Sequence, residues 1–316
     1  MKRTRGKRLG IGKKRMVVLC AAALAGVLML AGCGGKEEPE VPGETGEAAS
    51  ESSPVSAQEQ AQANETAEQT HMENAAMVEN DGEHSFLTGE KMAAEDVNKR
   101  PLAVMMNNRK EGCPQTGIAK ASIIYEAPVE GRVTRLMGLF ENYEEMDRIG
   151  YIRSSRDYFV YCALEYDAIY AHFGQATPYV GELLNSDRVD NISGAVAGID
   201  HPAANSFFRT TDRSAPNNVC LDIQGLLKDI DKMGYETVYG QTHKAKFAFA
   251  PDGTKPDNGA GAKAVNLYPG GKGNTAGNGY SLVEARFEYN EEDGKYYRYQ
   301  YGEPQIDLET GQQLTC

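Results

Sequence analysis

The feature that most limits what this chain can fold into is a long acidic segment without a single aromatic side chain. Residues 34–84 contain no Phe, Tyr or Trp and carry thirteen Asp and Glu against one Lys. Such a composition cannot bury enough apolar surface to offset the entropy lost on ordering. We therefore expect a disordered tether that spans roughly 35–45 Å. The packed structure is then expected from Phe86 onward.

The segment before the tether has the pattern of an export signal. Eight Lys and Arg precede residue 16, and an apolar run follows from Met16 to Ala31. This charged region and apolar region are typical of a signal peptide, and the run is shorter than the ~20 residues that span a bilayer. The run ends in Leu30-Ala31-Gly32-Cys33, which resembles the bacterial lipobox. We expect residues 1–32 to be removed, and the alternative is an uncleaved signal anchor.

Lipidation of Cys33 would attach the mature chain to a membrane without spanning it. One acyl chain binds a bilayer weakly, whereas two or three chains hold a protein stably. The residue after the cysteine is Gly34. An aspartate at this position would signal retention at an inner membrane, and this chain does not have one. We therefore expect a lipid-anchored protein on the outer face of the cytoplasmic membrane.

The net charge argues against several classes of partner. The whole chain has 33 Lys and Arg against 45 Asp and Glu, a net charge of −12. Removal of residues 1–32 takes away eight positive charges and no negative ones, which leaves 25 against 45, or −20. A chain of this charge has no general attraction for nucleic acid or anionic lipid. Any anion that it binds must be held by a local group of arginines.

The folded part is long enough for one large domain or two lobes. We place an α/β lobe at residues 85–238 and a smaller β-rich lobe at residues 239–316, after the tether at 33–84. Patterns of strand and helix alternate in the first lobe, which predicts a mixed α/β layer structure with a mixed sheet.

The apolar pattern of the first lobe predicts individual elements. The expected strands are Leu102–Met106, Ser122–Glu126, Val133–Phe140, Ile149–Ile152 and Ala168–Phe173. The expected helices are Asp157–Tyr166, Pro178–Leu184 and Asp222–Met233. The last helix is the clearest, because Asp222 can cap its start and Gly234 can end it.

The second lobe has a different composition. Residues 251–279 are rich in Gly, Asn, Pro and Lys, which predicts long turns. Strands are expected at Ala245–Ala250, Tyr280–Tyr289 and Lys295–Tyr301, the last two joined by a hairpin turn at residues 291–294. The chain stops at Cys316 just after a Thr-Gly turn, so we expect this lobe to be incomplete at its C-terminal end.

Several motifs resemble one protein family in the same order along the chain. They are "RPLAVMMNN" at 100–108, "PQTGIAKASIIYEAPVEGRVTRLMGLF" at 114–140, "IGYIRSSRDYF" at 149–159 and "EYDAIYAHFG" at 165–174. These motifs resemble the YerB-like lipoproteins, a domain-of-unknown-function family of Gram-positive bacteria. Residues 289–315 are similar to the C-terminal half of that family. The resemblance implies a lipid anchor, an acidic tether, an α/β first half and a β-rich second half, but no established reaction.

The motif at 149–159 places two arginines at a predicted junction of strand and helix. If Ser154 or Ser155 caps the helix, the first free amides share a space with Arg153, and such helix starts bind anions. Arg156 would lie in the first turn, where a cation opposes the helix dipole. It therefore needs a counter-charge. Glu126, Glu130 or another carboxylate could supply it, and so could a bound anion.

The expected ligand-binding set extends beyond this junction. His172 ends the strand-like run Ala168–Phe173, and ligands commonly bind at the C-terminal ends of strands in α/β sheets. That histidine could be a base, a donor to an anion, or a buried side chain with satisfied hydrogen bonds. The candidate ligand-binding residues are Arg135, Arg153, Ser154, Ser155, Arg156 and His172.

The candidates for catalysis are fewer. Glu126 and Glu130 lie four residues apart around Pro128, and paired carboxylates carry out glycoside hydrolysis. Acids beside arginines are also typical of structural ion pairs. The five histidines are widely spaced and no Cys-x-x-Cys occurs, so no metal or other cofactor is expected. One disulfide is possible among Cys113, Cys162 and Cys220.

These observations predict a lipid-anchored protein without catalysis that binds an anionic ligand or an envelope protein. The ligand could be a cell-wall fragment, a carboxylate or a phosphate. The first alternative is a cell-wall hydrolase that uses Glu126 or Glu130 with His172, which requires these groups to converge within about 6–9 Å. The second alternative is an interaction scaffold that uses the β-rich lobe.

Overall fold

A computed structural model describes most of the chain from residue 82 onward. The described residues are 82–176, 179–194, 196–240, 243, 245–250, 261–267 and 285–316. The expected signal peptide, Cys33 and nearly all of the tether lie outside them, as do most of the long turns expected at 251–279. None of the helices within this described part is long and apolar enough to cross a membrane.

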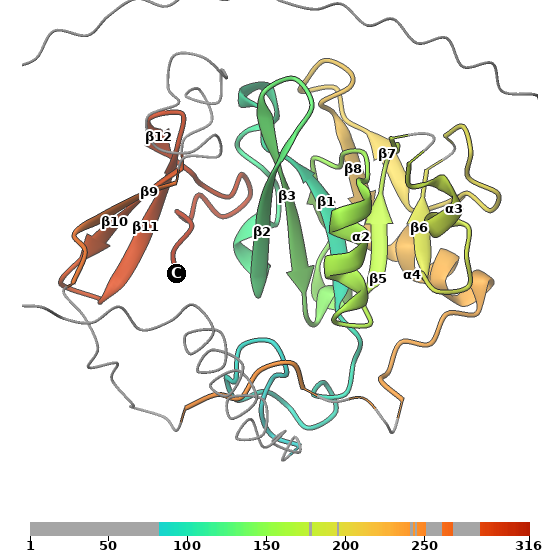
Figure 1. The fold of residues 1–316 in the computed structure, drawn as a ribbon, viewed down its shortest axis with the longest axis horizontal. Helices are drawn as coiled ribbons and strands as arrows, with labels where there is room; N and C mark the ends of the chain where they lie inside the picture. The colour runs from blue at the N-terminus through green and yellow to red at the C-terminus, as the bar shows by residue number, and fades with distance from the viewer. Residues whose placement is uncertain are drawn as a thin grey trace, which may run out of the picture. The chain divides into compact units, whose positions relative to one another are not determined.

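A five-stranded mixed sheet forms the centre of the α/β part (Figure 1). Its strands are β1 Leu102–Asn107, β2 Ile123–Val129, β3 Val133–Phe140, β5 Ile169–His172 and β6 Asn191–Ser193. The spatial order is β2-β3-β1-β5-β6. Strands β1, β5 and β6 run parallel to one another, whereas β2 and β3 are antiparallel neighbours. The sheet is therefore mixed, as the sequence predicted.

A smaller antiparallel sheet and three helices accompany the central sheet. The small sheet has the order β4-β8-β7, with β4 Arg148–Gly150, β7 Phe207–Arg209 and β8 Val219–Asp222. The helices are α2 Asp157–Leu164, α3 Gly181–Leu184 and α4 Ile223–Met233. Three short 3₁₀ turns are η1 Lys110–Gly112, η2 Ile118–Lys120 and η3 Tyr143–Glu145.

Both faces of the central sheet are covered by apolar side chains. On one face Met105 and Tyr170 pack with Phe159 of α2, which lies over this face in Figure 1. On the other face Val104 packs in a cluster that includes Leu226 of α4. All six residues of β1 are buried, which explains why its sequence is a continuous apolar run rather than an alternating one.

Helix α4 confirms the clearest expectation from the sequence. The carboxylate of Asp222 accepts a hydrogen bond from the backbone N–H of Gly225 at 2.6 Å, and Gly234 ends the helix with a φ of 71°. Both features satisfy backbone groups that a helix end leaves unpaired. The sequence did not reveal that Asp229 is buried and accepts hydrogen bonds from the backbone N–H groups of Asn205 and Ser206. That carboxylate ties α4 to the loop before β7.

The C-terminal part is β-rich, as expected. It forms a sheet of order β12-β11-β10-β9, with β9 Ala264–Leu267, β10 Ala285–Asn290, β11 Lys295–Gln300 and β12 Glu303–Pro304. The expected hairpin is confirmed, because Asn290 pairs with Lys295 across the turn. An α/β part with a mixed sheet is therefore followed by a smaller β-rich part.

Three expectations about single elements were wrong. Residues 245–250 are not a strand, because Phe247 packs near the ring of Tyr166 and the segment pairs with no described strand. The strand expected at Ser122–Glu126 continues through Pro128 to Val129, since β2 lies at the sheet edge, where a missing N–H costs little. The strand expected at Ile149–Ile152 ends at Gly150.

Gly225 in α4 provides a test of this packing. A Cβ atom at Gly225 would lie 2.1 Å from the backbone oxygen of Asn205. We expect Gly225→Ala to lower the free energy of unfolding by about 1–3 kcal/mol, because neither backbone can move away without distortion. Gly181→Ala in α3 is the matched control, since its nearest neighbouring atom would be 3.6 Å away. Urea unfolding of both variants measures this, and equal stabilities would contradict the described packing.

Candidate functional site

The segment of residues 151–155 is inserted between the ends of two parallel strands. The N–H of Arg153 donates to the carbonyl of Met105, next to the end of β1, at 2.9 Å. On the other side of the segment, the N–H of Ser155 donates to the carbonyl of Gly174, just after β5, also at 2.9 Å. The segment therefore separates the C-terminal ends of β1 and β5, the position where α/β sheets commonly bind ligands.

Gly174 allows the close approach of these two segments. Its φ is +97°, and a Cβ atom there would lie 2.5 Å from the hydroxyl of Ser154. The carbonyl of Gly174 also lies 2.7 Å from Nδ1 of His172. The carbonyl oxygen of Gly174 is thus in hydrogen-bond contact with both the N–H of Ser155 and the ring of His172.

Neither serine of the junction caps α2, so that expectation was wrong. Ser155 is fully buried, and its hydroxyl lies 2.8 Å from the hydroxyl of Tyr170. Arg156 is the N-cap residue without a side-chain capping bond, and the N–H of Tyr158 is bonded to the carboxylate of Asp157. The strand-like pairing of Ser155 with the residues after β5 delays the helix, which begins only at Asp157.

The counter-charge of Arg156 is Glu130. Nε of Arg156 lies 2.9 and 3.0 Å from the two carboxylate oxygens, and Nη2 contacts the same group. These hydrogen bonds lower the pKa of Glu130, despite the opposing effect of partial burial. Of the two carboxylates that the sequence offered as partners, the exposed one in the β2–β3 turn is therefore used.

Arg135 differs from its neighbours because it is buried without a carboxylate. It lies on β3, is 7% exposed, and donates from Nη1 to the carbonyl of Ser154. Among the described residues no carboxylate forms an ion pair with it. Burial, together with the positive charges of Arg156 and Arg153, lowers the pKa of Arg135 to about 10, and the negative charge of Glu130 acts in the opposite direction. The side chain is still a cation at neutral pH.

Arg153 completes a group of cations. Its Nη1 donates to the carbonyl of Pro216 at 3.1 Å, and it forms no ion pair within the described part of the chain. Partial burial lowers its pKa, as do the nearby charges of Arg109 and Arg156. We call Arg135, Arg153 and Arg156 the arginine cluster. It holds three guanidinium groups, and Glu130 is the carboxylate bonded to it.

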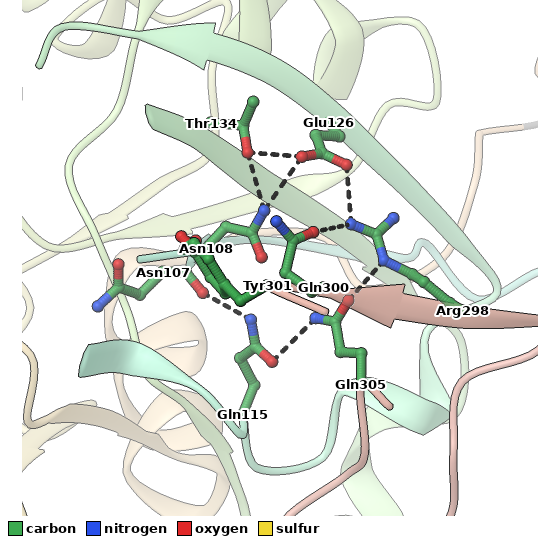
Figure 2. A network of polar contacts seen from close by, with 9 residues as sticks. All are labelled: Asn107, Asn108, Gln115, Glu126, Thr134, Arg298, Gln300, Tyr301 and Gln305. Carbon is green, nitrogen blue, oxygen red and sulfur yellow. Dashed lines mark hydrogen bonds and ion pairs between the residues drawn. The ribbon is translucent and has the colours of Figure 1, made fainter. Parts of the chain in front are cut away.

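Glu126 belongs to a separate network on the other face of the sheet (Figure 2). Its carboxylate accepts hydrogen bonds from Arg298 at 2.8 Å, Asn108 at 3.1 Å and Thr134 at 2.5 Å. Both charged side chains are shielded, with 7% of Arg298 and 13% of Glu126 exposed. This ion pair connects β2 of the central sheet with β11 of the C-terminal sheet.

Amide side chains extend this network. Arg298 also donates to Gln300 and Gln305, and Gln305 in turn donates to Gln115 at 3.1 Å. Figure 2 shows Asn108 and Gln300 among these side chains, and each retains one buried polar atom without a partner among the described residues. The glutamate that the sequence offered for catalysis is thus the centre of a structural contact.

His172 is buried and fully engaged. Its Nε2 lies 2.8 Å from Oδ1 of Asn191, and Nδ1 faces the carbonyl of Gly174. Burial lowers the pKa of His172 to about 4, so the ring is neutral at physiological pH. A neutral ring donates only one hydrogen bond, and the amide of Asn191 must therefore present its N–H₂ group to the other nitrogen. The ring positions the strand ends rather than facing a ligand.

The structure does not bring the candidate catalytic groups together. Glu126 is on β2 and His172 is on β5, with β3 and β1 between them. Three strand spacings correspond to about 14 Å at the backbone. Glu130 is bound to Arg156 instead. At the backbone, Glu126 and His172 are therefore farther apart than the roughly 6–9 Å expected for paired catalytic groups.

The described residues hold neither a metal-binding cluster nor a disulfide. No group of three or more His, Cys, Asp or Glu side chains there could hold a metal ion. Cys113, Cys162, Cys220 and Cys316 are all free thiols. Burial raises the pKa of Cys113 to about 11, which leaves this thiol protonated and unreactive at neutral pH.

Sequence reasoning missed one residue beside the cluster. Arg109 follows the end of β1, and its backbone N–H donates to the side chain of Asn107 at 3.1 Å. Its positive charge acts on Arg153. The signal for it was present in the sequence, because Arg109 directly follows the turn Asn107-Asn108 after a buried strand.

The α/β part with this cluster matches a known protein family. Residues 87–236 match the family described as "Protein of unknown function (DUF3048) N-terminal domain". This range includes the whole central sheet and the arginine cluster. The matched part of the chain is therefore similar to the YerB-like family, as its motifs predicted.

Comparisons with the YerB protein of Bacillus subtilis, by sequence and by structure, support this similarity. "Putative lipoprotein YerB" of strain 168 is 31% identical over 150 residues, which cover 48% of this chain and 43% of that protein. The chain thus matches less than half the length of this relative. The crystal structure of the YerB protein has a TM-score of 0.60 at 25% identity, and the match covers 73% of this chain and 71% of that one.

The burial of His172 predicts a pH dependence. Because its folded pKa of about 4 lies below the ordinary value of 6.5, only the unfolded chain takes up a proton between these pH values. The free energy of unfolding should therefore fall with pH by about 1.4 kcal/mol per unit below pH 6.5, or about 2 kcal/mol at pH 5. His172→Gln should remove this dependence, whereas exposed His201→Gln should retain it. Urea unfolding measures both, and identical pH profiles would contradict the assignment.

Proposed function

We propose that this chain is a lipoprotein, anchored through Cys33 to the outer face of the cytoplasmic membrane, whose α/β part binds an anionic ligand at the arginine cluster. The observation that carries this proposal is the buried, unpaired guanidinium of Arg135. The signal pattern and the lipobox-like residues before Cys33 support the anchor. The word lipoprotein in the name of the B. subtilis relative supports it as well.

A buried cation without a counter-charge is costly for a fold. The effective penalty for removing an ion from water is several kcal/mol, and an ion pair offsets it only with good geometry. The guanidinium of Arg135 is largely removed from water and donates one hydrogen bond to the carbonyl of Ser154 instead. The positive charges of Arg153 and Arg156 also act on it. An anion bound among these three groups would offset the penalty, whereas the fold alone gains little from the charge.

The cluster also lies where a ligand can reach it. Arg153 is partly exposed and carries no ion pair among the described residues, and it lies between the C-terminal ends of β1 and β5. Guanidinium groups bind carboxylate and phosphate with two parallel hydrogen bonds. The ligand class is therefore a carboxylate or a phosphate, and a non-catalytic role fits the separation of Glu126 from His172.

Binding of anions tests the proposal directly. The full lipidated chain in phosphatidylcholine vesicles is titrated with glycerol phosphate and, separately, with a muropeptide by calorimetry. We expect Arg153→Gln to weaken binding of the preferred anion by roughly 10- to 100-fold, because a hydrogen bond to a charged group contributes about 1.5–3 kcal/mol. Arg286→Gln in the C-terminal sheet is the matched control, since this exposed arginine pairs only with Glu288 of its own strand. Unchanged affinity in Arg153→Gln, or no binding of either anion by the natural chain, would refute the proposal.

Stability measurements on Arg135 separate a functional from a structural charge. We expect Arg135→Met to leave the free energy of unfolding unchanged or to raise it by about 1–3 kcal/mol, because an uncompensated buried charge is removed. The same variant should lose anion binding. A purely structural arginine would behave oppositely, with a loss of about 3–5 kcal/mol on removal. Urea unfolding of the variant without ligand decides between these outcomes.

A further inference from the structure

We infer that the ligand is a linear polyanion with several phosphate groups, such as a polyol phosphate chain, and that Arg109 extends the arginine cluster to hold it. This inference rests on the proposed function and specifies its ligand. It depends on how the cations are distributed over neighbouring strands, on which of them are already paired, and on how readily those pairs can be exchanged.

The cations lie in a row across the end of the sheet. Arg135 on β3 is paired in register with Asn107, the last residue of β1. The N–H of Asn107 donates to the carbonyl of Tyr151, so the segment that carries Arg153 is the next neighbour. Arg135 and Arg153 are thus about two strand spacings apart, or roughly 10 Å at the backbone. One phosphate group is too small to fill a row of this width.

Arg109 adds a fourth cation near this row. It directly precedes η1, two residues beyond Asn107, and its side chain is 49% exposed. Its charge acts on Arg153, whereas the cations that act on Arg135 are Arg156 and Arg153. Arg109 therefore acts on the cluster through Arg153.

Among the described residues, two carboxylates form ion pairs with these cations. Glu111 contacts Arg109 at 3.4 Å and is 61% exposed, and Glu130 contacts Arg156 and is 69% exposed. Exposed ion pairs of this kind contribute only about 0–1 kcal/mol, so an incoming anion can replace them at little cost. Arg153 and Arg135 form no ion pair in the described structure, although the charge of Glu130 also acts on Arg135. A chain of phosphates fits this pattern, with one group at the centre and others exchanging with Glu111 and Glu130.

A comparison of monomer and polymer tests the inference. The full lipidated chain in phosphatidylcholine vesicles is titrated with glycerol phosphate and with soluble poly(glycerol phosphate), at equal total phosphate and at several salt concentrations. We expect the polymer to bind at least about tenfold more tightly, because linked groups bind at high effective concentration. Its affinity should also fall more steeply with salt, by about 0.7 in slope for each phosphate contacted.

Arg109→Gln distinguishes this inference from the proposed function. We expect it to weaken polymer binding about tenfold and to reduce the salt slope by about 0.7, with glycerol phosphate binding unchanged. Arg153→Gln should weaken the binding of both ligands, and Arg286→Gln should weaken the binding of neither.

If monomer and polymer bind equally and Arg109→Gln has no effect, the polyanion inference is overturned while the anion site remains. If neither ligand binds but a muropeptide does, the phosphate class is overturned. Equal binding to phosphatidylglycerol vesicles would assign the row to a lipid surface and also overturn the inference.

Discussion

The insertion of residues 151–155 between β1 and β5 is the constraint on which the rest of the site depends. Two parallel strands that pair at their beginnings are separated at their ends by the backbone hydrogen bonds of Arg153 and Ser155. The buried hydroxyl of Ser155 contacts the hydroxyl of Tyr170, and the buried ring of His172 contacts the carbonyl of Gly174. Both contacts hold this arrangement in place. Because these side chains are engaged with the protein itself, the arginines of the same motif are the groups left to meet a ligand.

The alternation of side chains along a strand explains why Arg135 has no carboxylate partner. Glu126 is on the strand next to it, but Ala127 is the residue paired with Arg135, so Glu126 points to the opposite face. There it is held by Arg298 in a buried network with the C-terminal sheet. The two faces at this end of the sheet therefore have different roles. One joins the two parts of the fold, and the other holds the arginine cluster, in which Arg135 and Arg153 form no ion pair among the described residues.

The sequence predicted those features that local patterns determine. The buried run of β1, the amphipathic pattern and caps of α4, and the hairpin between β10 and β11 depend on neighbouring residues only. The three-residue strands β6 and β7 are too short to show such a pattern. The same distinction between local patterns and contacts of distant segments applies to the site. Its arginines were visible as a motif, but the partner of Arg156, the burial of His172 and the role of Arg298 arise from contacts between distant segments.

The acidity of the whole chain does not oppose a local anion site. Thirteen of the 45 acidic residues lie in the segment 34–84, which leaves 24 Lys and Arg against 32 Asp and Glu from residue 85 onward. At physiological ionic strength charges are screened beyond about 8 Å, so a ligand at the cluster responds mainly to the nearest groups. Those groups are Arg153, the still protonated Arg135 and the Arg156–Glu130 pair, a local excess of positive charge. A negatively charged protein can therefore carry a selective anion site, because the surrounding acidity discourages nonspecific binding of polyanions elsewhere on its surface.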